Sequence, residues 1–245
     1  MLELNCVSLR VQTREKIVMK YTYYGHACFG IEVAGKHLLF DPFIRENELA
    51  KDIQIEDIQA DYIFLSHGHF DHVADVVEIA KRTQATVVAN FEIYTWLGKQ
   101  GVDNAHPMNH GGSWRFDFGK VKMVNAIHSS ELPDGSYGGN PAGFVFTTEE
   151  GNFYYAGDTA LHMDMKLIPM TSGHLHFAIL PIGDNFTMGI ADAIIAADFV
   201  KCDRVIGVHY DTFGFIKIDQ DKAKVLFAQH GKELILTDIG QTIEL

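Results

Sequence analysis

The stretch Ser66-His67-Gly68-His69-Phe70-Asp71-His72 places three imidazoles and one carboxylate in six consecutive positions, 67 to 72. It follows the apolar run Tyr62-Ile63-Phe64-Leu65, which is too short for a typical helix and is interpreted as a buried strand. Side chains alternate along an extended segment, so His67 and His69 point the same way and can hold one cation together. Asp71 and His72 lie beyond the turn and can serve a second cation. The alternative is an ordinary polar loop, but four ligand-type side chains this close together favour a metal site.

Three more ligand-type residues, His128, Asp158 and His209, each stand just after a predicted strand. Taken singly, each has an ordinary alternative. His128 could be a hydrogen-bonded loop residue, Asp158 a turn former or helix N-cap, and His209 a polar residue that closes a strand. Strand ends on one rim of a sandwich can converge, so their shared placement predicts one common site.

The order of predicted elements is strands with interspersed helices throughout, which favours an α/β sandwich with a mixed sheet core. The length of 245 residues suits one domain, which we place at residues 20–245, with residues 1–19 as an extension of unknown role. We expect a hairpin joined at Gly119-Lys120. Helices are predicted over 74–82, 91–99, 161–170, 190–200 and 220–230.

The net charge is −12, from 20 basic and 32 acidic residues, and the basic residues form no stripe. This argues against nucleic acid and against anionic membranes as partners, and no apolar run approaches the roughly 18 residues of a membrane span. The first twenty residues lack the continuous apolar segment of a signal peptide. Cys6, Cys28 and Cys202 are few, odd in number and far apart, which suggests reduced thiols and a cytoplasmic location. The oligomeric state is left open, a homo-oligomer included.

At this point the chain resembles a known family. His-x-His-x-Asp-His, then a lone histidine, then Gly157-Asp158-Thr159, then a late histidine is similar to the metal pattern of the metallo-β-lactamase fold superfamily. Gly25-His26-Ala27, Phe40-Asp41-Pro42 and the late His209-Tyr210 resemble its ascorbate-6-phosphate-lactonase-like branch of metal-dependent hydrolases. N-acyl-phosphatidylethanolamine phospholipase D carries a similar pattern. The resemblance covers residues 20–245 and implies an αββα sandwich, in which helices cover two mixed sheets and the metals lie at one edge between them.

The resemblance also implies a ligand set, and all seven positions match. It assigns His67, His69 and His128 to one metal, assigns Asp71, His72 and His209 to the other, and makes Asp158 the bridge between them. Flavodiiron members usually have glutamate where this chain has His69, which argues against a redox role. β-Lactamases commonly have other ligands at the second site, which argues against an antibiotic substrate.

The expected function is hydrolysis of an ester, lactone or phosphodiester bond in a small molecule by hydroxide held on two divalent ions. Zinc is the favoured metal, although manganese or iron can occupy the same geometry. Asp71 would orient the hydroxide or accept its proton, and no Gly-x-Ser-x-Gly or Walker-type sequence offers another nucleophile. Two alternatives stay open: a phosphodiesterase for lipid or nucleotide-like substrates, and a metal-binding protein without catalysis.

Other polar residues are candidates for contacts with the ligands or the substrate. Asp41 could accept a hydrogen bond from a ligating imidazole or end its strand in an Asp-Pro turn. His26 could contact substrate or close the first hairpin, and Asn185 could be an oxyanion or substrate donor or a turn residue. Ser129 and Met188 lie in segments expected to face the same rim.

Overall fold

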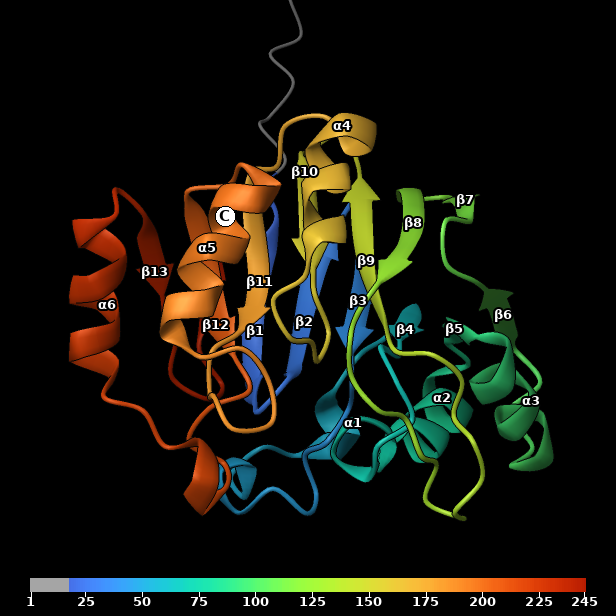
Figure 1. Ribbon diagram of the computed structural model, residues 1–245. Helices are drawn as coiled ribbons and strands as arrows, with labels where there is room; N and C mark the ends of the chain where they lie inside the picture. Colours follow the sequence, from blue (N-terminus) through green and yellow to red (C-terminus); the bar gives the residue numbers. More distant parts are fainter. Residues whose placement is uncertain (1–17) are drawn as a thin grey trace, which may run out of the picture.

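The computed structural model describes residues 18–245 (Figure 1), so the predicted extension, residues 1–19, lies outside the described residues except for its last two. Residues 18–245 form two seven-stranded sheets, in the orders β14-β1-β2-β3-β4-β5-β6 and β13-β12-β11-β10-β9-β8-β7. The strands of the first sheet are β1 (Lys20–Gly25), β2 (Cys28–Val33), β3 (Lys36–Phe40), β4 (Tyr62–Phe64), β5 (Thr86–Asn90), β6 (Ala105–Met108) and β14 (Thr242–Glu244). Those of the second are β7 (Ser113–Phe116), β8 (Gly119–Asn125), β9 (Ala142–Thr147), β10 (Asn152–Tyr155), β11 (Phe177–Pro181), β12 (Arg204–Val208) and β13 (Glu233–Ile235).

Both sheets are mixed. In the first, β1, β2 and β3 pair antiparallel and β3 to β6 pair parallel. In the second, β7 to β10 pair antiparallel and β10 to β13 pair parallel. The strands β8, β10 and β12 therefore run in the same direction, and their carboxyl ends share one rim of the sandwich.

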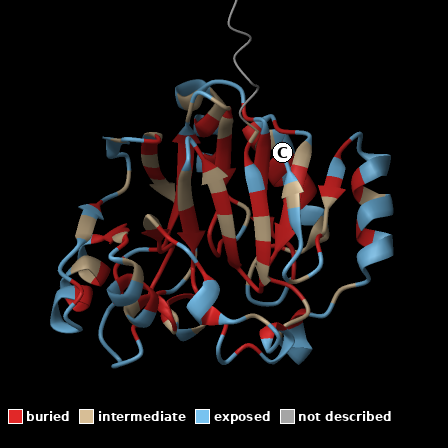
Figure 2. Cartoon of the chain, turned by 180° about the vertical axis from the view of Figure 1, so that it is seen from behind, coloured by how far each residue is buried: buried red, intermediate tan, exposed pale blue. Residues whose placement is uncertain are grey.

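Alternation along the strands separates three apolar cores. In β3, Phe40 belongs to the core between the sheets, whereas its neighbour Leu39 faces the outer core beside α2 and α3. A third core lies between the second sheet and the helices α5 and α6. Figure 2 shows buried residues concentrated in the strands and exposed residues on the outward faces of the helices. The result is four layers, so the predicted αββα sandwich is confirmed.

The α-helices are short, and four 3-10 turns accompany them. They are α1 (Phe70–Val73), α2 (Val76–Thr83), α3 (Phe91–Lys99), α4 (Ile168–Ser172), α5 (Ile190–Val200) and α6 (Gln220–Gln229), with 3-10 turns η1 (Glu48–Ala50), η2 (Ile55–Asp57), η3 (Met163–Leu167) and η4 (Gly214–Ile216). Within residues 18–245, no helix combines the length and the apolar character needed to cross a membrane.

Two sequence predictions about elements were wrong. The β7–β8 hairpin turns at 117–118, because Phe116 pairs with Gly119. Gly119 belongs to β8, where a Cβ atom would lie 2.6 Å from the carbonyl oxygen of Thr147 on β9. The single helix predicted over 161–170 is instead η3 followed by α4, with Pro169 in the first turn of α4. Proline has no N–H to continue the hydrogen-bonding of a preceding helix, so one continuous helix does not form.

Candidate metal centre

The motif after β4 turns back on itself and gathers its own side chains. His67 Nε2 lies 2.9 Å from His69 Nδ1, so these two imidazoles do meet on one side of the chain. His69 is the N-cap of α1, and its carbonyl oxygen accepts the backbone N–H of His72 at 2.9 Å. The single turn of α1 thereby brings Asp71 and His72 back beside the first two histidines.

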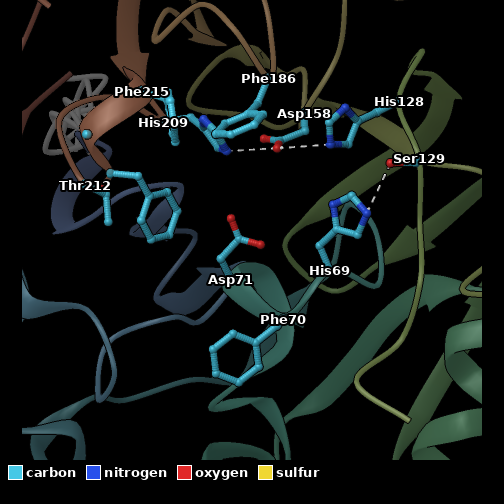
Figure 3. A pocket seen from close by; sticks show the side chains of 12 residues that line it. His69, Phe70, Asp71, His128, Ser129, Asp158, Phe186, His209, Thr212 and Phe215 are labelled. Carbon is cyan, nitrogen blue, oxygen red and sulfur yellow. Dashed lines mark hydrogen bonds and ion pairs between the residues drawn. The ribbon is translucent and has the colours of Figure 1, made fainter. Parts of the chain in front are cut away.

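The other three predicted ligands come from the second sheet and meet the motif at Asp158. Four imidazole Nε2 atoms surround Asp158 Oδ2, at 2.9 Å from His209, 3.3 Å from His72, 3.6 Å from His128 and 4.0 Å from His67. Figure 3 shows Asp158 between His209 and His128, with His69 and Asp71 facing the same cavity. All seven side chains are thus brought together at the rim where β8, β10 and β12 end.

The ligand atoms form three groups within this cluster, two of which share no residue. One of these consists of His67, His69 and His128, and the other of His26, Asp71, His72 and His209, with the atoms of each group within 4.8 Å of one another. The third, Asp41 with His67 and His72, overlaps both. Asp158 lies between the first two groups. This division matches the predicted two sets of ligands, with His26 as an addition.

A divalent cation fits these residues. His72 Nε2 and Asp158 Oδ1 are buried and have no hydrogen-bond partner among the described residues. Burying such atoms without a partner costs free energy, which a bound cation would recover. Imidazole nitrogens with carboxylate oxygens are the donor set that zinc and similar first-row divalent ions accept.

Burial sets the protonation of most of the cluster. It holds the pKa of His67 well below the ordinary value and, with the nearby His72, also lowers the pKa of His69. The pKa of His128 is lowered as well, again chiefly by burial. These imidazoles are therefore neutral near pH 7, which is the form that binds a metal ion.

Two groups in the cluster hold opposite charges when no metal is bound. Burial alone would raise the pKa of Asp158, but His209 and His72 outweigh it and hold that pKa well below the ordinary value. Burial alone would lower the pKa of His72, but Asp158 and Asp71 raise it well above the ordinary value. His72 therefore carries a proton beside an ionised carboxylate, and a metal ion would take the place of that proton.

Asp41 organises the ligands from behind and is fully buried. Its Oδ2 accepts hydrogen bonds from His72 Nδ1 at 2.9 Å and from the Tyr155 hydroxyl at 2.6 Å, while its Oδ1 accepts the Ser66 N–H at 2.7 Å. The Ser66 hydroxyl in turn lies 3.0 Å from Nδ1 of His67. The predicted contact between Asp41 and an imidazole is present, and it leaves His72 Nε2 to face Asp158.

His26 lies beneath the centre, with its side chain fully buried. Its Nε2 lies 3.0 Å from Asp71 Oδ2 and its Nδ1 lies 3.1 Å from the Thr212 hydroxyl. Burial, together with His209, lowers the pKa of His26 to about 4, so the neutral ring can donate from Nε2 to Asp71. The residue also has a φ of 56° between β1 and β2, and its carbonyl oxygen accepts the His209 N–H at 2.7 Å. It therefore closes the hairpin and orients a predicted ligand.

The remaining candidates fall in different places. The Ser129 hydroxyl lies 3.2 Å from His69 Nε2, on the cavity wall. Met188 is buried in the core under α5. The prediction of Asn185 as an oxyanion or substrate donor is not supported. It is an exposed turn residue with a φ of 55°, and it lines a neighbouring pocket with Lys217 instead of this cavity. A glycine and an aspartate before it, Gly183-Asp184, favour such a turn, as the alternative interpretation stated.

The apolar walls of the site were not predicted from the sequence. A cavity of about 740 Å³ opens beside the centre, and its lining includes Thr212 and four phenylalanines, Phe70, Phe186, Phe213 and Phe215. Phe70 sits inside the motif itself, between His69 and Asp71, which was the one available indication. The others follow in loops whose path depends on the packing of distant strands.

Comparison with known proteins places the chain in a family. The model of a β-lactamase superfamily domain matches residues 36–210. A UPF0173 metal-dependent hydrolase of Christiangramia forsetii is 58% identical over 228 residues, covering 93% of this chain and 100% of the relative. The UPF0173 metal-dependent hydrolase YtkL of Bacillus subtilis is 46% identical over 233 residues, with 93% and 100% covered.

This chain belongs to the UPF0173 family of metal-dependent hydrolases. The predicted metallo-β-lactamase superfamily is thereby confirmed, and the protein is an enzyme. Among solved structures, Igni18, a metallo hydrolase from the hyperthermophilic archaeon Ignicoccus hospitalis, resembles this UPF0173 hydrolase with a TM-score of 0.84 and 30% identity. The likeness covers 94% of this chain and 99% of that one.

Proposed function

We propose that this UPF0173 hydrolase holds two divalent ions, zinc in preference to manganese or iron, and cleaves an ester, lactone or phosphodiester bond in a small molecule. The observation that carries the proposal is the single oxygen Asp158 Oδ2, which lies within 4.0 Å of four imidazole Nε2 atoms drawn from two sheets. One carboxylate between two groups of imidazoles suits a pair of cations better than one. When bound, the ions supply a water activated at neutral pH and Lewis acidity toward the substrate.

The residues of the chain have distinct roles in this proposal. His67, His69 and His128 hold one ion, Asp71, His72 and His209 hold the other, and Asp158 lies between them. Asp71 also lines the cavity, so its carboxylate can orient the attacking water or take its proton. Burial would raise the pKa of Asp71, but His72 and the hydrogen bond from His26 lower it below the ordinary value. The carboxylate is therefore ionised and fixed in position by His26.

The size and charge of the molecule support a small substrate. A cavity of about 740 Å³ lies within the range of small-molecule sites. The net charge of −12 opposes a nucleic-acid substrate.

Metal analysis of the purified protein, combined with a panel of esters, lactones and phosphodiesters, tests the proposal. We expect about two equivalents of zinc and turnover of at least one class. His69→Ala and Asp158→Ala should each lower the metal content below the two equivalents expected of the unchanged protein and reduce hydrolysis by at least about 100-fold. Asp221→Ala changes an exposed carboxylate on α6 and serves as the control. Full activity in either ligand variant would refute the assignment.

A further inference from the structure

Four phenylalanines from three separate segments form the apolar walls of the cavity beside the metal centre. Phe70 comes from α1, Phe186 from the loop between β11 and α5, and Phe213 and Phe215 from the segment between β12 and α6. Figure 3 shows Phe70 and Phe186 on opposite sides of the cavity, with Asp71 and Asp158 between them. The four rings therefore line the cavity beside the ligands, where a substrate would bind.

One wall is fixed from behind. The buried ring of Phe43 lies 5.9 Å from the ring of Phe70 and 6.4 Å from that of Phe213, between centroids. The Phe213 ring also packs edge-on against His26 at 5.3 Å. This wall is held in place by groups that also support Asp71.

A second aromatic pair lines another part of the cavity. The rings of Phe186 and Phe215 meet edge to face, with centroids 6.2 Å apart and an angle of 76°. Phe215 is 77% exposed and Phe186 is 48% exposed. Large apolar side chains gathered in this way on a cavity, without burial of their own, are typical of a binding site.

The charged side chains that line the cavity also restrict which substrates can bind. Among the described residues, no lysine or arginine lines it, and its only acidic groups are Asp71 and Asp158. Lys217 and Lys222 line the neighbouring pocket. A phosphate or carboxylate on the part of a substrate away from the metal centre would lose its water without gaining a cation.

We propose that the substrate carries no charge outside the group that is cleaved, and has an aromatic or similarly bulky apolar group next to that bond. The apolar group lies among the four phenylalanines, where rings pack edge to face or offset. Sugar phosphates and nucleotides, which carry further anionic groups, are poor substrates. The cleavage of this bond rests on the proposed function. The binding of the apolar group in the cavity does not depend on it.

The binding test uses the zinc-loaded full-length protein and three hydroxamates, measured by titration calorimetry. We expect phenylacetohydroxamate to bind at least about tenfold more tightly than acetohydroxamate, because its ring leaves water for the cavity. The monohydroxamate of succinate should bind no more tightly than acetohydroxamate. Phe186→Ala and Phe215→Ala should each reduce the phenyl-to-methyl affinity ratio about threefold or more. Phe91→Ala removes a ring that is 56% exposed outside this cavity and should leave the ratio unchanged.

The variants are tested for folding by their binding of acetohydroxamate, which reports an intact metal centre. Equal affinities for the phenyl and methyl compounds, or tighter binding of the succinate compound, would overturn the inference. So would an unchanged ratio in both cavity variants.

Proton release from methyl phenylacetate, methyl acetate and monomethyl succinate extends the test to turnover without an aromatic leaving group. The phenyl ester should have the highest kcat/KM, and a preference for the succinate ester would contradict the inference. If the binding ratio holds while no ester, lactone or phosphodiester is cleaved, the proposed reaction fails and the cavity inference stands.

Discussion

At the scale of single residues, the second layer of hydrogen bonds decides how the ligands are held. Asp41 is fully buried and receives donors from Ser66, His72 and Tyr155. Groups that orient a metal-bound imidazole commonly change metal affinity by about 10–100-fold when they are removed. The Tyr155 hydroxyl is therefore expected to act on the metal centre through Asp41, although it touches no ligand itself.

Tyr155→Phe and Tyr154→Phe make a matched test of this role, because both tyrosines are on β10 and fully buried. Tyr155→Phe removes the 2.6 Å hydrogen bond to Asp41 and keeps the ring, so zinc affinity should fall about tenfold. The Tyr154 hydroxyl is buried and has no hydrogen-bond partner within residues 18–245, so Tyr154→Phe should leave zinc affinity unchanged and keep or raise the free energy of unfolding. Competition with a chelator measures zinc affinity, and urea unfolding measures stability. An equal loss of zinc affinity in the two variants would contradict the role of Tyr155.

At the scale of elements, the loop at 129–141 is tied both to the motif and to α3. The Ser130 hydroxyl accepts the Gly68 N–H at 3.0 Å, and the Gly138 N–H donates to the Ser130 carbonyl oxygen at 3.0 Å. Asn90 caps α3 through Ile93 N–H and donates from Nδ2 to the carbonyl oxygen of Gly138 at 2.7 Å. The cap of α3 thus fixes a loop that borders His67 and His69.

Asn90→Ala should therefore weaken both stability and the site. Loss of the cap costs about 1 kcal/mol, and the buried loop carbonyl left without its donor adds roughly 1 kcal/mol more. Zinc affinity should fall as well, because the motif loop loses its support. The Asp219 side chain is the N-cap of α6 and accepts the Lys222 N–H at 3.0 Å. Asp219→Ala should therefore lower the free energy of unfolding by only about 1 kcal/mol and leave zinc affinity unchanged. Urea unfolding and chelator competition separate the two effects, and unchanged zinc affinity in Asn90→Ala would show that the loop does not support the centre.

Helices and metal ligands could be predicted from the sequence, whereas some turns and the cavity walls could not. Period and caps place α3, α5 and α6 within a residue of their bounds, because each helix has an apolar face and polar ends. The ligands were predictable because they follow strands, and the sandwich gathers strand ends at one rim. The β7–β8 turn was not predictable, because glycine marks both turns and close approaches, and only the neighbouring strand decides which applies. Asn185 was open to two interpretations, and the turn that Gly183-Asp184 favour is the one observed. The phenylalanines of the cavity depend on loops that the sequence pattern does not position.

At the scale of the whole molecule, the metal centre connects the two sheets. His67, His69, Asp71 and His72 follow β4 of the first sheet, whereas His128, Asp158 and His209 follow strands of the second. Ions bound between them would bind the folded state and not the unfolded chain. Bound metal would therefore stabilise the folded state by mass action.

Metal-free protein should show a dependence of stability on pH that arises from the buried histidines alone. In the metal-free protein, burial and His209 lower the pKa of His26 from 6.5 to about 4, and the pKa of His67 is lowered too. The unfolded chain then binds more protons than the folded one below about pH 6.5, so the free energy of unfolding falls as the pH falls from about 6.5 to 4. Each such group contributes up to roughly 1.4 kcal/mol per pH unit in that window. The raised pKa of His72 acts at higher pH. Protonated His72 stabilises the folded state, and this contribution is lost as the pH rises above about 6.5.

Urea unfolding of chelator-treated protein at pH 7 and pH 5 measures this effect. The midpoint should be lower at pH 5, and the difference between the two pH values should shrink in His26→Asn, because asparagine tolerates the φ of 56° and does not titrate. His230→Asn changes an exposed histidine at the end of α6 and is the control. It should leave the difference between the midpoints at pH 7 and pH 5 the same as in the unchanged protein. Metal-free protein that is as stable at pH 5 as at pH 7 would mean that the buried imidazoles gain protons without unfolding, and hence that the rim opens before the two sheets separate.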